Sequence, residues 1–383
     1  MNKNRKIIYL AGFVFSLSLA LISYINSSFI SSFIDEKLVG TIYALASFVS
    51  IFALLLIPKI FRRIGAYKFL LWAIGLNALS ILLFSLSKNA LNAIVFFILI
   101  FTFNILIYSS LDELLKISSR DSATGKIRGS YLTFCNLAWI IAQLAFGTIL
   151  GGFSLRMIYL VSFVMMLLFF VISHSYLSDI RDPKYDQTTT KKYILEFFRN
   201  KNLFRAYGIS FLLQFFYAWM VIYTPIYLSI HLGFSWKEIG IIFAIMLLPF
   251  IILDIPLGKF SDKIGERKML MFGFTIASLA TLSLFFIQIH AVWIWALLLF
   301  ITRIGAANIE VMSEAYFFKH IKPEEEQFIQ VYRSSSPVAY ILGPLLAFVV
   351  FIFIPSFNLI YTILGIIMLF GVYLSSTIKK SDI

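Results

Sequence analysis

The chain has 383 residues, of which 60% are hydrophobic, 17% aromatic and only 13% charged. Soluble domains contain about 45–50% apolar and about 25% charged residues, so a soluble enzyme, a nucleic-acid-binding protein and a disordered scaffold all fit poorly. The net charge of +13 is typical of a membrane protein, because Lys and Arg accumulate in cytoplasmic loops.

A helix that crosses the hydrocarbon core of a bilayer needs about 20 apolar residues. Stretches of this kind predict twelve membrane-spanning helices. The first begins after several basic residues, as a signal peptide does, but it is too long and no cleavage site follows, so we interpret it as a retained helix. The predicted spans are 7–30, 38–58, 67–87, 90–113, 128–151, 155–177, 203–230, 236–257, 268–288, 291–316, 329–354 and 357–378.

The positions of the basic residues predict how these helices are oriented. With the N-terminus inside, most Lys and Arg residues fall in cytoplasmic segments, whereas Lys37, Lys88, Arg156 and Lys237 fall on the opposite side and Arg303 lies within a span. The positive-inside rule therefore predicts a multi-pass protein of the cell (inner) membrane with both termini in the cytoplasm.

The longest polar stretch, 178–202, separates six predicted helices from six. We expect an N-terminal half at 1–177, a cytoplasmic central loop at 178–202 and a C-terminal half at 203–383. The other connections are short, a phosphate-binding loop motif is absent, and the four histidines lack the spacing of metal ligands. The sequence therefore predicts no enzyme activity, catalytic residue, metal or cofactor.

Two corresponding loops share a motif. After the eighth predicted span the sequence reads GKFSDKIGERK from Gly258 to Lys268, and after the second it reads PKIFRRIGAYK from Pro58 to Lys68. The glycine near the end of each, such as Gly265, permits the positive φ and the close backbone approach of a tight turn between two helices.

The second copy resembles the signature loop of the major facilitator superfamily, although Glu266 stands where a base is expected. The matching residues are Gly258, Asp262, Lys263, Gly265, Arg267 and Lys268. The resemblance implies an all-α polytopic fold with twelve helices in two six-helix halves. It also implies a secondary transporter that binds a small-molecule substrate between the halves and works by alternating access without ATP.

Both halves carry an acid and an arginine at the predicted cytoplasmic rim. Glu113 and Glu314 end the fourth and tenth predicted spans, and Arg128 and Arg333 open the fifth and eleventh. Together with Asp262 and Arg267 of the signature loop, they are candidates for an ion-pair network that closes the inward side. Each exposed pair is worth only about 0–1 kcal/mol, and interfacial charge without a gating role is the alternative.

The tenth predicted span contains two charged residues, Arg303 and Glu310. A charge at the bilayer centre costs about 2.5–3.5 kcal/mol on insertion scales, which makes such a residue a functional candidate. The spacing of 303, 307, 310 and 314 places these positions on one helix face, with Arg303 and Glu310 about 10.5 Å apart along the axis. We expect a role in substrate binding or proton coupling; a structural ion pair is the alternative.

Further polar candidates lie in other predicted spans. Gln214 and Tyr217, three residues apart in the aromatic seventh span, can line a cavity, and Asn104 and Gln143 lie in the fourth and fifth. Buried amides in a membrane usually face the bundle interior, where they contact either substrate or other helices.

Taken together, these features predict secondary active transport of a small organic solute, coupled to protons. Efflux of an amphipathic, drug-like compound is the leading hypothesis, and uptake of a sugar or organic-acid nutrient is its rival. A non-transporting membrane protein, such as a lipid scramblase, is a more distant alternative. The expected partners are the solute, protons and the lipid bilayer, with no nucleic acid, and the expected state is a monomer.

Overall fold

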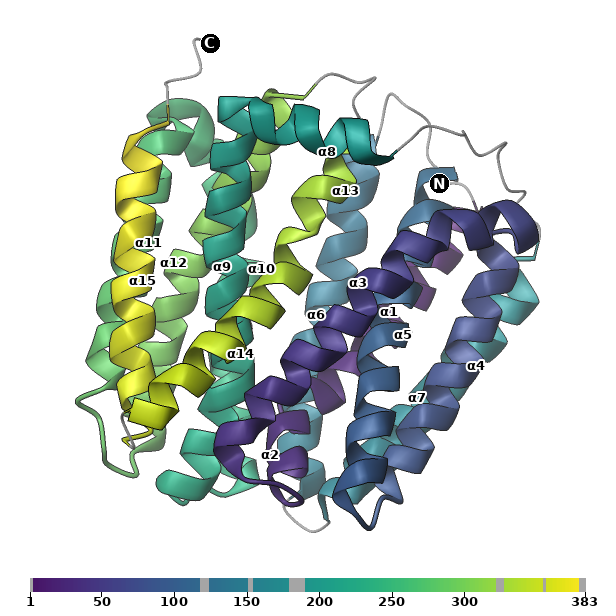
Figure 1. The fold of residues 1–383 in the computed structure, drawn as a ribbon, viewed down its shortest axis with the longest axis horizontal. Helices are drawn as coiled ribbons and strands as arrows, with labels where there is room; N and C mark the ends of the chain where they lie inside the picture. The colour runs from purple at the N-terminus through teal and green to yellow at the C-terminus, as the bar shows by residue number, and fades with distance from the viewer. Residues whose placement is uncertain are drawn as a thin grey trace. The chain divides into compact units, whose positions relative to one another are not determined.

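The computed structural model describes residues 3–117, 124–150, 154–178, 190–321, 327–353 and 356–378, and most of them are helical (Figure 1). The contacts between residues divide the chain into two compact units, Met1–Asp186 and Gln187–Ile383.

In the first unit, α1 packs against α6 and α7, α4 packs against α5 and α7, and α3 packs against α5. Small hydroxyl side chains join α1 to α7, because Ser18 Oγ donates to the carbonyl oxygen of Ser162 and Ser162 Oγ donates back to Ser18, each at 2.9 Å. Lipid gives little hydrophobic drive between helices, so such packing and hydrogen bonds hold them together. The elements are α1 (Lys3–Ser23), α2 (Asn26–Ser31), η1 (Glu36–Leu38), α3 (Val39–Ile64), α4 (Ala66–Ser85), α5 (Ala90–Ile117), α6 (Thr124–Leu150) and α7 (Leu155–Tyr176).

In the second unit, α11 packs against α12 and α15, α10 packs against α12, and α9 packs against α12, α14 and α15. The contact between α11 and α12 is close because Gly305 lies on it: a Cβ there would be 2.6 Å from the backbone of Gly273 and Ala277. The elements are α8 (Thr190–Arg199), α9 (Lys201–Ile226), η3 (Tyr227–His231), α10 (Trp236–Ile264), α11 (Glu266–Leu284), α12 (Val292–Lys319), α13 (Gln327–Arg333), α14 (Ser335–Phe353) and α15 (Leu359–Ser376).

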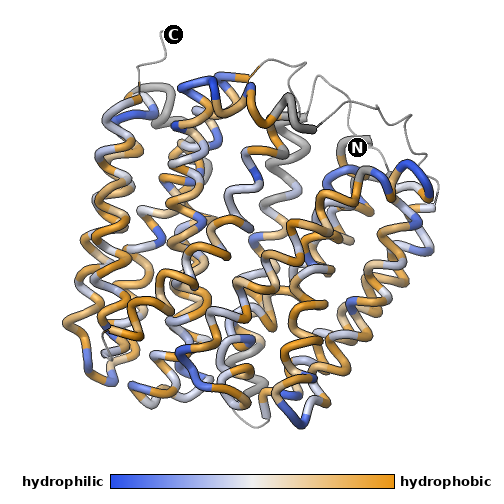
Figure 2. Tube along the Cα trace, viewed as in Figure 1, coloured by the Kyte–Doolittle hydropathy of each residue, from blue (hydrophilic) through white to orange (hydrophobic). Residues whose placement is uncertain are grey.

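The described residues contain ten helical segments long and apolar enough to cross a membrane. The other two predicted spans correspond to α6, whose apolar stretch over described side chains is Thr133–Ala145, and to α11, which begins with three charged residues. Apolar residues follow the helices and hydrophilic residues gather at helix ends (Figure 2). The prediction of an all-helical polytopic membrane protein is confirmed.

Three predicted spans are not single α-helices, contrary to expectation. The first is divided into α1 and α2, and the eleventh into α13 and α14 at Ser334, whose hydroxyl donates to the Val331 carbonyl oxygen at 2.7 Å. The seventh ends in the π-helical turn η3 just after Pro225, which cannot donate a backbone hydrogen bond. Hydropathy detects the length of these spans but not local changes in backbone hydrogen bonding.

The stretch 178–202 also differs from the predicted loop, since α8 forms within it; residues 179–189 lie outside the described ranges. The Phe197 side chain of α8 is fully buried, and its ring centroid lies 6.3 Å from that of Phe317 and 5.7 Å from that of Phe328. The helix is amphipathic but too short to span a membrane, so a search for long apolar stretches misses it.

Candidate functional site

Arg303, Tyr217 and Glu310 lie together in the second unit, where α12 supplies the two charges and α9 supplies the tyrosine. The Cζ atom of Arg303 lies over the ring of Tyr217, 5.4 Å from its centroid. The hydroxyl of the same tyrosine donates a hydrogen bond to Glu310 Oε2 at 2.8 Å. Tyr217 therefore contacts both charged residues through two different parts of one side chain.

Arg303 is buried, with only 1% of its surface exposed. Its Cζ atom also lies 5.0 Å from the ring centroid of Phe216, so two aromatic rings face the cation. Each cation–π contact contributes about 0.5–2 kcal/mol, so the two together supply about 1–4 kcal/mol, which is comparable with the cost of about 2.5–3.5 kcal/mol for placing a charge at the bilayer centre. The Arg303 Nη1 atom has no hydrogen-bond partner in the described part of the chain.

Within the described ranges, no ion pair of 4.0 Å or less joins Arg303 to Glu310. Their separation along α12, about 10.5 Å at 1.5 Å per residue, accounts for this. The sequence places the two residues on one helix face, and the structure shows what lies between them: the ring of Tyr217 from α9. Both charged residues contact that one side chain.

A group of hydroxyls lies next to Glu310 and was not predicted. Ser313 Oγ donates to the backbone oxygen of Glu310 at 3.1 Å, and the Tyr332 hydroxyl donates to Ser313 Oγ at 3.2 Å. Ser210 and Ser335 also share a hydrogen bond of 2.8 Å. The first contact is local to α12, whereas the other two join α13 to α12 and α9 to α14. No spacing along the sequence indicates these two, because their partners belong to different helices.

Of the three amide candidates, Gln214 lies near Tyr217, whereas Asn104 and Gln143 form hydrogen bonds to neighbouring helices. Gln214 is half-buried on α9, one turn before Tyr217. In the first unit, Asn104 Oδ1 accepts a hydrogen bond from Asn77 Nδ2 at 2.7 Å, and Gln143 Nε2 donates to the backbone oxygen of Ala20 at 3.1 Å. In these two contacts the amides join helices.

The signature loop is built as a helix that ends in a glycine turn. The backbone is helical through Gly258 and Asp262 up to Ile264, although the side chains at 258–263 lie outside the description. Gly265 has φ 84° and ψ 148°, and Gly65 has nearly the same values, 83° and 156°. The expected positive φ is present at both glycines, and among the described atoms beyond its chain neighbours none lies within 4 Å of a Cβ built on Gly265.

The predicted rim residues are placed unevenly. Arg267, Glu314 and Arg333 are exposed and Glu113 is half-buried, while the side chain of Arg128 lies outside the described ranges.

An unpredicted ion pair lies at the same end of the second unit, between Glu266 at the start of α11 and Lys319 at the end of α12. Only 6% of the Glu266 side chain is exposed, against 45% of Lys319. The acid that departs from the family pattern is therefore a buried member of an ion pair. Its partner is far away in sequence, so no local motif reveals it.

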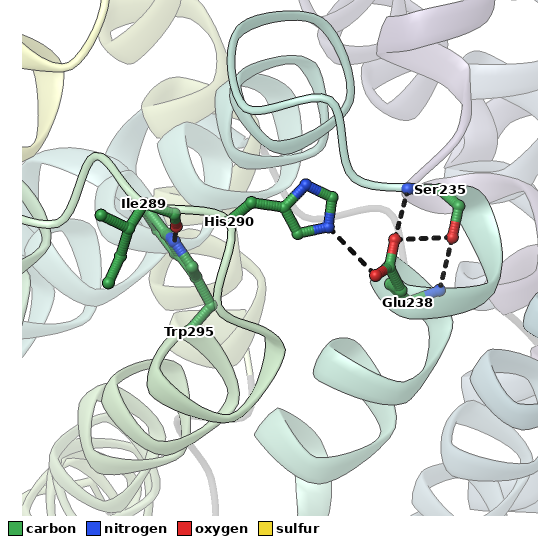
Figure 3. A network of polar contacts seen from close by, with 5 residues as sticks. All are labelled: Ser235, Glu238, Ile289, His290 and Trp295. Carbon is green, nitrogen blue, oxygen red and sulfur yellow. Dashed lines mark hydrogen bonds and ion pairs between the residues drawn. The ribbon is translucent and has the colours of Figure 1, made fainter.

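At the opposite end of α10, Glu238 forms a reciprocal cap with Ser235, as Figure 3 shows. The backbone N–H of Ser235 donates to Glu238 Oε2 at 2.8 Å and the backbone N–H of Glu238 donates to Ser235 Oγ at 3.4 Å, which is the capping-box arrangement. The Ser235 hydroxyl also donates to Glu238 Oε2 at 2.7 Å. Glu238 Oε1 lies 3.0 Å from Nε2 of His290, which precedes α12. The Glu238 carboxylate therefore caps the N-terminus of α10 and also contacts the connection between α11 and α12.

Comparison with known proteins places this geometry in context. The family model described as Major Facilitator Superfamily matches residues 8–246 and 224–381. Among solved structures, a POT family transporter in complex with 5-aminolevulinic acid is 11% identical, with a TM-score of 0.80 over 97% of this chain and 95% of that chain. No curated protein sequence matches this chain significantly.

Two other solved structures share the fold. A bacterial homolog of the human lysosomal transporter Spinster, in an inward-facing and unoccupied conformation, is 13% identical, with a TM-score of 0.72 over 98% of this chain and 95% of that chain. A nucleoside transporter is 11% identical, with a TM-score of 0.74 over 97% of this chain and 99% of that chain. Identities this low show the fold alone. The predicted superfamily fold is confirmed.

Proposed function

We propose that this chain, which belongs to the major facilitator superfamily, moves a small amphipathic organic solute across the membrane in exchange for protons. Membership makes it a multi-pass secondary transporter of a small-molecule substrate and not an enzyme. The coupling ion, the solute and the direction of transport are the parts that we propose.

The observation that carries the proposal is the contact of Tyr217 with both Arg303 and Glu310. Proton coupling needs a group that gains and loses a proton. It also needs a contact through which the charge of that group affects the binding of the solute. Glu310 is a carboxylate within a membrane helix, and Tyr217 donates to it. A change in the charge of Glu310 alters that hydrogen bond, and the ring that carries the hydroxyl is the one over which Arg303 lies.

The surroundings of these residues favour a solute with an apolar part. Phe216 and Tyr217 face Arg303, and the ring of Phe250 lies 6.2 Å from that of Tyr217, centroid to centroid. Ligand sites are usually lined by apolar and aromatic groups, with a few polar groups that fix orientation. We therefore retain efflux of an amphipathic compound as the leading direction. Alternating access is reversible, so the gradients decide which way the solute moves.

Alternating access requires two conformations whose populations differ by only a few kcal/mol. We propose that the 1–177 and 203–383 halves are the moving parts and that the rim residues bias their equilibrium. We further propose that the protein works as a monomer, and that both termini and the central segment 178–202 face the cytoplasm, following the distribution of basic residues.

Flux in proteoliposomes tests the function. Purified protein is reconstituted, an inward or outward pH gradient is imposed with the membrane potential clamped, and the distribution of ethidium, glucose or gluconate is followed. Gradient-dependent accumulation of a probe, absent from protein-free liposomes, supports proton-coupled transport. Equilibration without accumulation would support a uniporter and contradict the coupling.

A labelling experiment tests the orientation independently. A single cysteine replaces Thr190 at the start of α8 in a Cys135→Ala background, because Cys135 is the chain's one native cysteine. We expect no reaction with an impermeant maleimide in intact cells and full reaction after permeabilisation. Strong labelling in intact cells would reverse the proposed topology.

A further inference from the structure

We infer that Arg303 binds a carboxylate of the transported solute, so that the substrate class is a small organic acid with an apolar part. This inference rests on the proposed transport function and adds the chemistry of its ligand.

The first argument is the state of the cation. Arg303 is 1% exposed and its Nη1 atom has no hydrogen-bond partner among the described residues. Arginine keeps its charge in proteins, so it cannot avoid the cost of burial by losing a proton. A buried charge is retained where it is paired or where it has a function. A ligand oxyanion supplies the missing partner.

The second argument is that the acid on the same helix face does not pair with the cation. Glu310 Oε2 accepts the hydrogen bond from Tyr217, and two helical turns separate Glu310 from Arg303. Among the described residues, the guanidinium contacts the rings of Phe216 and Tyr217, which carry no formal charge. The positive charge is therefore left for a group that arrives from outside the chain.

The third argument is the geometry of the guanidinium. Its Cζ atom lies over the two rings, at 5.0 and 5.4 Å from their centroids, so the rings hold the cation in place without supplying an oxygen acceptor for its N–H groups. The N–H groups point outward in the plane of the guanidinium, where they match the two oxygens of a carboxylate. The half-buried ring of Tyr217 also offers apolar surface to the rest of the solute.

Equilibrium binding to the purified full-length protein in nanodiscs tests this inference without any gradient. Thermal unfolding is measured with pairs that differ only in charge: benzoate and benzamide, phenylacetate and phenylacetamide, gluconate and gluconamide. Ligands that bind the folded state raise the unfolding temperature. We expect saturable stabilisation by at least one carboxylate and none by its amide. Matched phosphonates distinguish a carboxylate site from a phosphate site.

Variants of Arg303 connect the binding to this residue. Arg303→Met should still fold, because removing a buried charge without a partner is often neutral or stabilising, and carboxylate affinity should fall about 10- to 150-fold. Arg303→Lys retains the charge but loses the planar fork, so it should restore only part of the affinity. The control Lys237→Gln, at an exposed position at the start of α10, should bind as the wild type does.

Three results would overturn the inference: stabilisation by no carboxylate in the series, equal stabilisation by amides, or carboxylate affinity unchanged in Arg303→Met. Stronger binding of phosphonates than of carboxylates would reassign the site to phosphate esters. Failure of gradient-driven flux with carboxylate binding intact would instead remove the proposed proton coupling and leave this inference standing.

Discussion

The proposed role of Glu310 in proton coupling predicts that replacing it with Gln abolishes coupling without abolishing transport. The variant keeps the shape of the side chain and an oxygen that accepts the hydrogen bond from Tyr217, which is 2.8 Å long in the wild type. It cannot gain or lose a proton. We therefore expect Glu310→Gln to exchange solute across the membrane but to lose accumulation driven by a pH gradient.

The loss of stability and the loss of solute accumulation expected for Glu310→Gln can both be given a magnitude. A hydrogen bond to a charged group is worth about 1.5–3 kcal/mol and a neutral one about 0.5–1.5 kcal/mol, so the substitution costs about 1 kcal/mol of stability at this half-buried contact. One proton per solute moving down a gradient of one pH unit supplies about 1.4 kcal/mol, which corresponds to about tenfold accumulation. The variant should lower that ratio to about one while remaining folded.

The assay compares two readings from the same proteoliposomes, with the membrane potential clamped. Steady-state accumulation under a pH gradient reports coupling, and counterflow of labelled against unlabelled solute reports exchange. Glu196→Gln, at an exposed position on α8, is the matched control and should resemble the wild type in both. Tenfold accumulation by Glu310→Gln would refute the coupling role, and loss of counterflow as well would indicate a binding role instead.

Four further predictions test other features. Tyr217→Phe keeps the ring over Arg303 but removes the hydroxyl that donates to Glu310. Flux driven by a pH gradient should therefore fall, while carboxylate binding in nanodiscs persists. A loss of binding would contradict the assignment of coupling to the Tyr217 hydroxyl and of binding to Arg303. Gly265→Ala places a side chain at φ 84° and should lower stability by about 1–2 kcal/mol in denaturation; no loss would mean that the turn relaxes. Lys319→Gln should destabilise more than Glu266→Gln, because it removes the cation beside a carboxylate that is only 6% exposed; the reverse order of unfolding temperatures would contradict this. Glu238→Gln weakens the cap of α10 and should cost about 1 kcal/mol; an unchanged unfolding temperature would show that the amide caps equally well.

The sequence predicts the helices well because the solvent is lipid. A bilayer requires each spanning backbone to satisfy its own hydrogen bonds over about 20 residues, and that requirement appears directly in hydropathy. Hydropathy says nothing about the turn at Ser334 or the π-helical turn after Pro225, since both are changes of local hydrogen bonding within apolar sequence. Hydropathy also misses α8, whose ten residues are too few to span a membrane but include the buried Phe197.

The sequence predicts the part of the candidate site that lies within one helix, but not the contacts between helices. Helical spacing alone places Arg303 and Glu310 on one face of α12, because neighbours three or four residues apart lie together on any helix. The contact that joins them comes from Tyr217, which is 93 residues before Glu310. Which face of α9 meets which face of α12 depends on packing between helices, and a single sequence carries no record of it. The Glu266 and Lys319 pair was missed for the same reason.

The arrangement of the three residues explains how one site can respond to two partners. If Arg303 and Glu310 formed a direct ion pair, each would neutralise the other, and a solute or a proton would have to break that pair to bind. The ring of Tyr217 instead leaves the Arg303 cation available to an anion. The hydrogen bond that its hydroxyl donates to Glu310 is stronger when Glu310 is charged than when it is protonated. Arrival of a solute at Arg303 and of a proton at Glu310 can therefore be related through the position of a single side chain. This is why Tyr217, which carries no charge of its own, is the residue whose substitution should uncouple the two events.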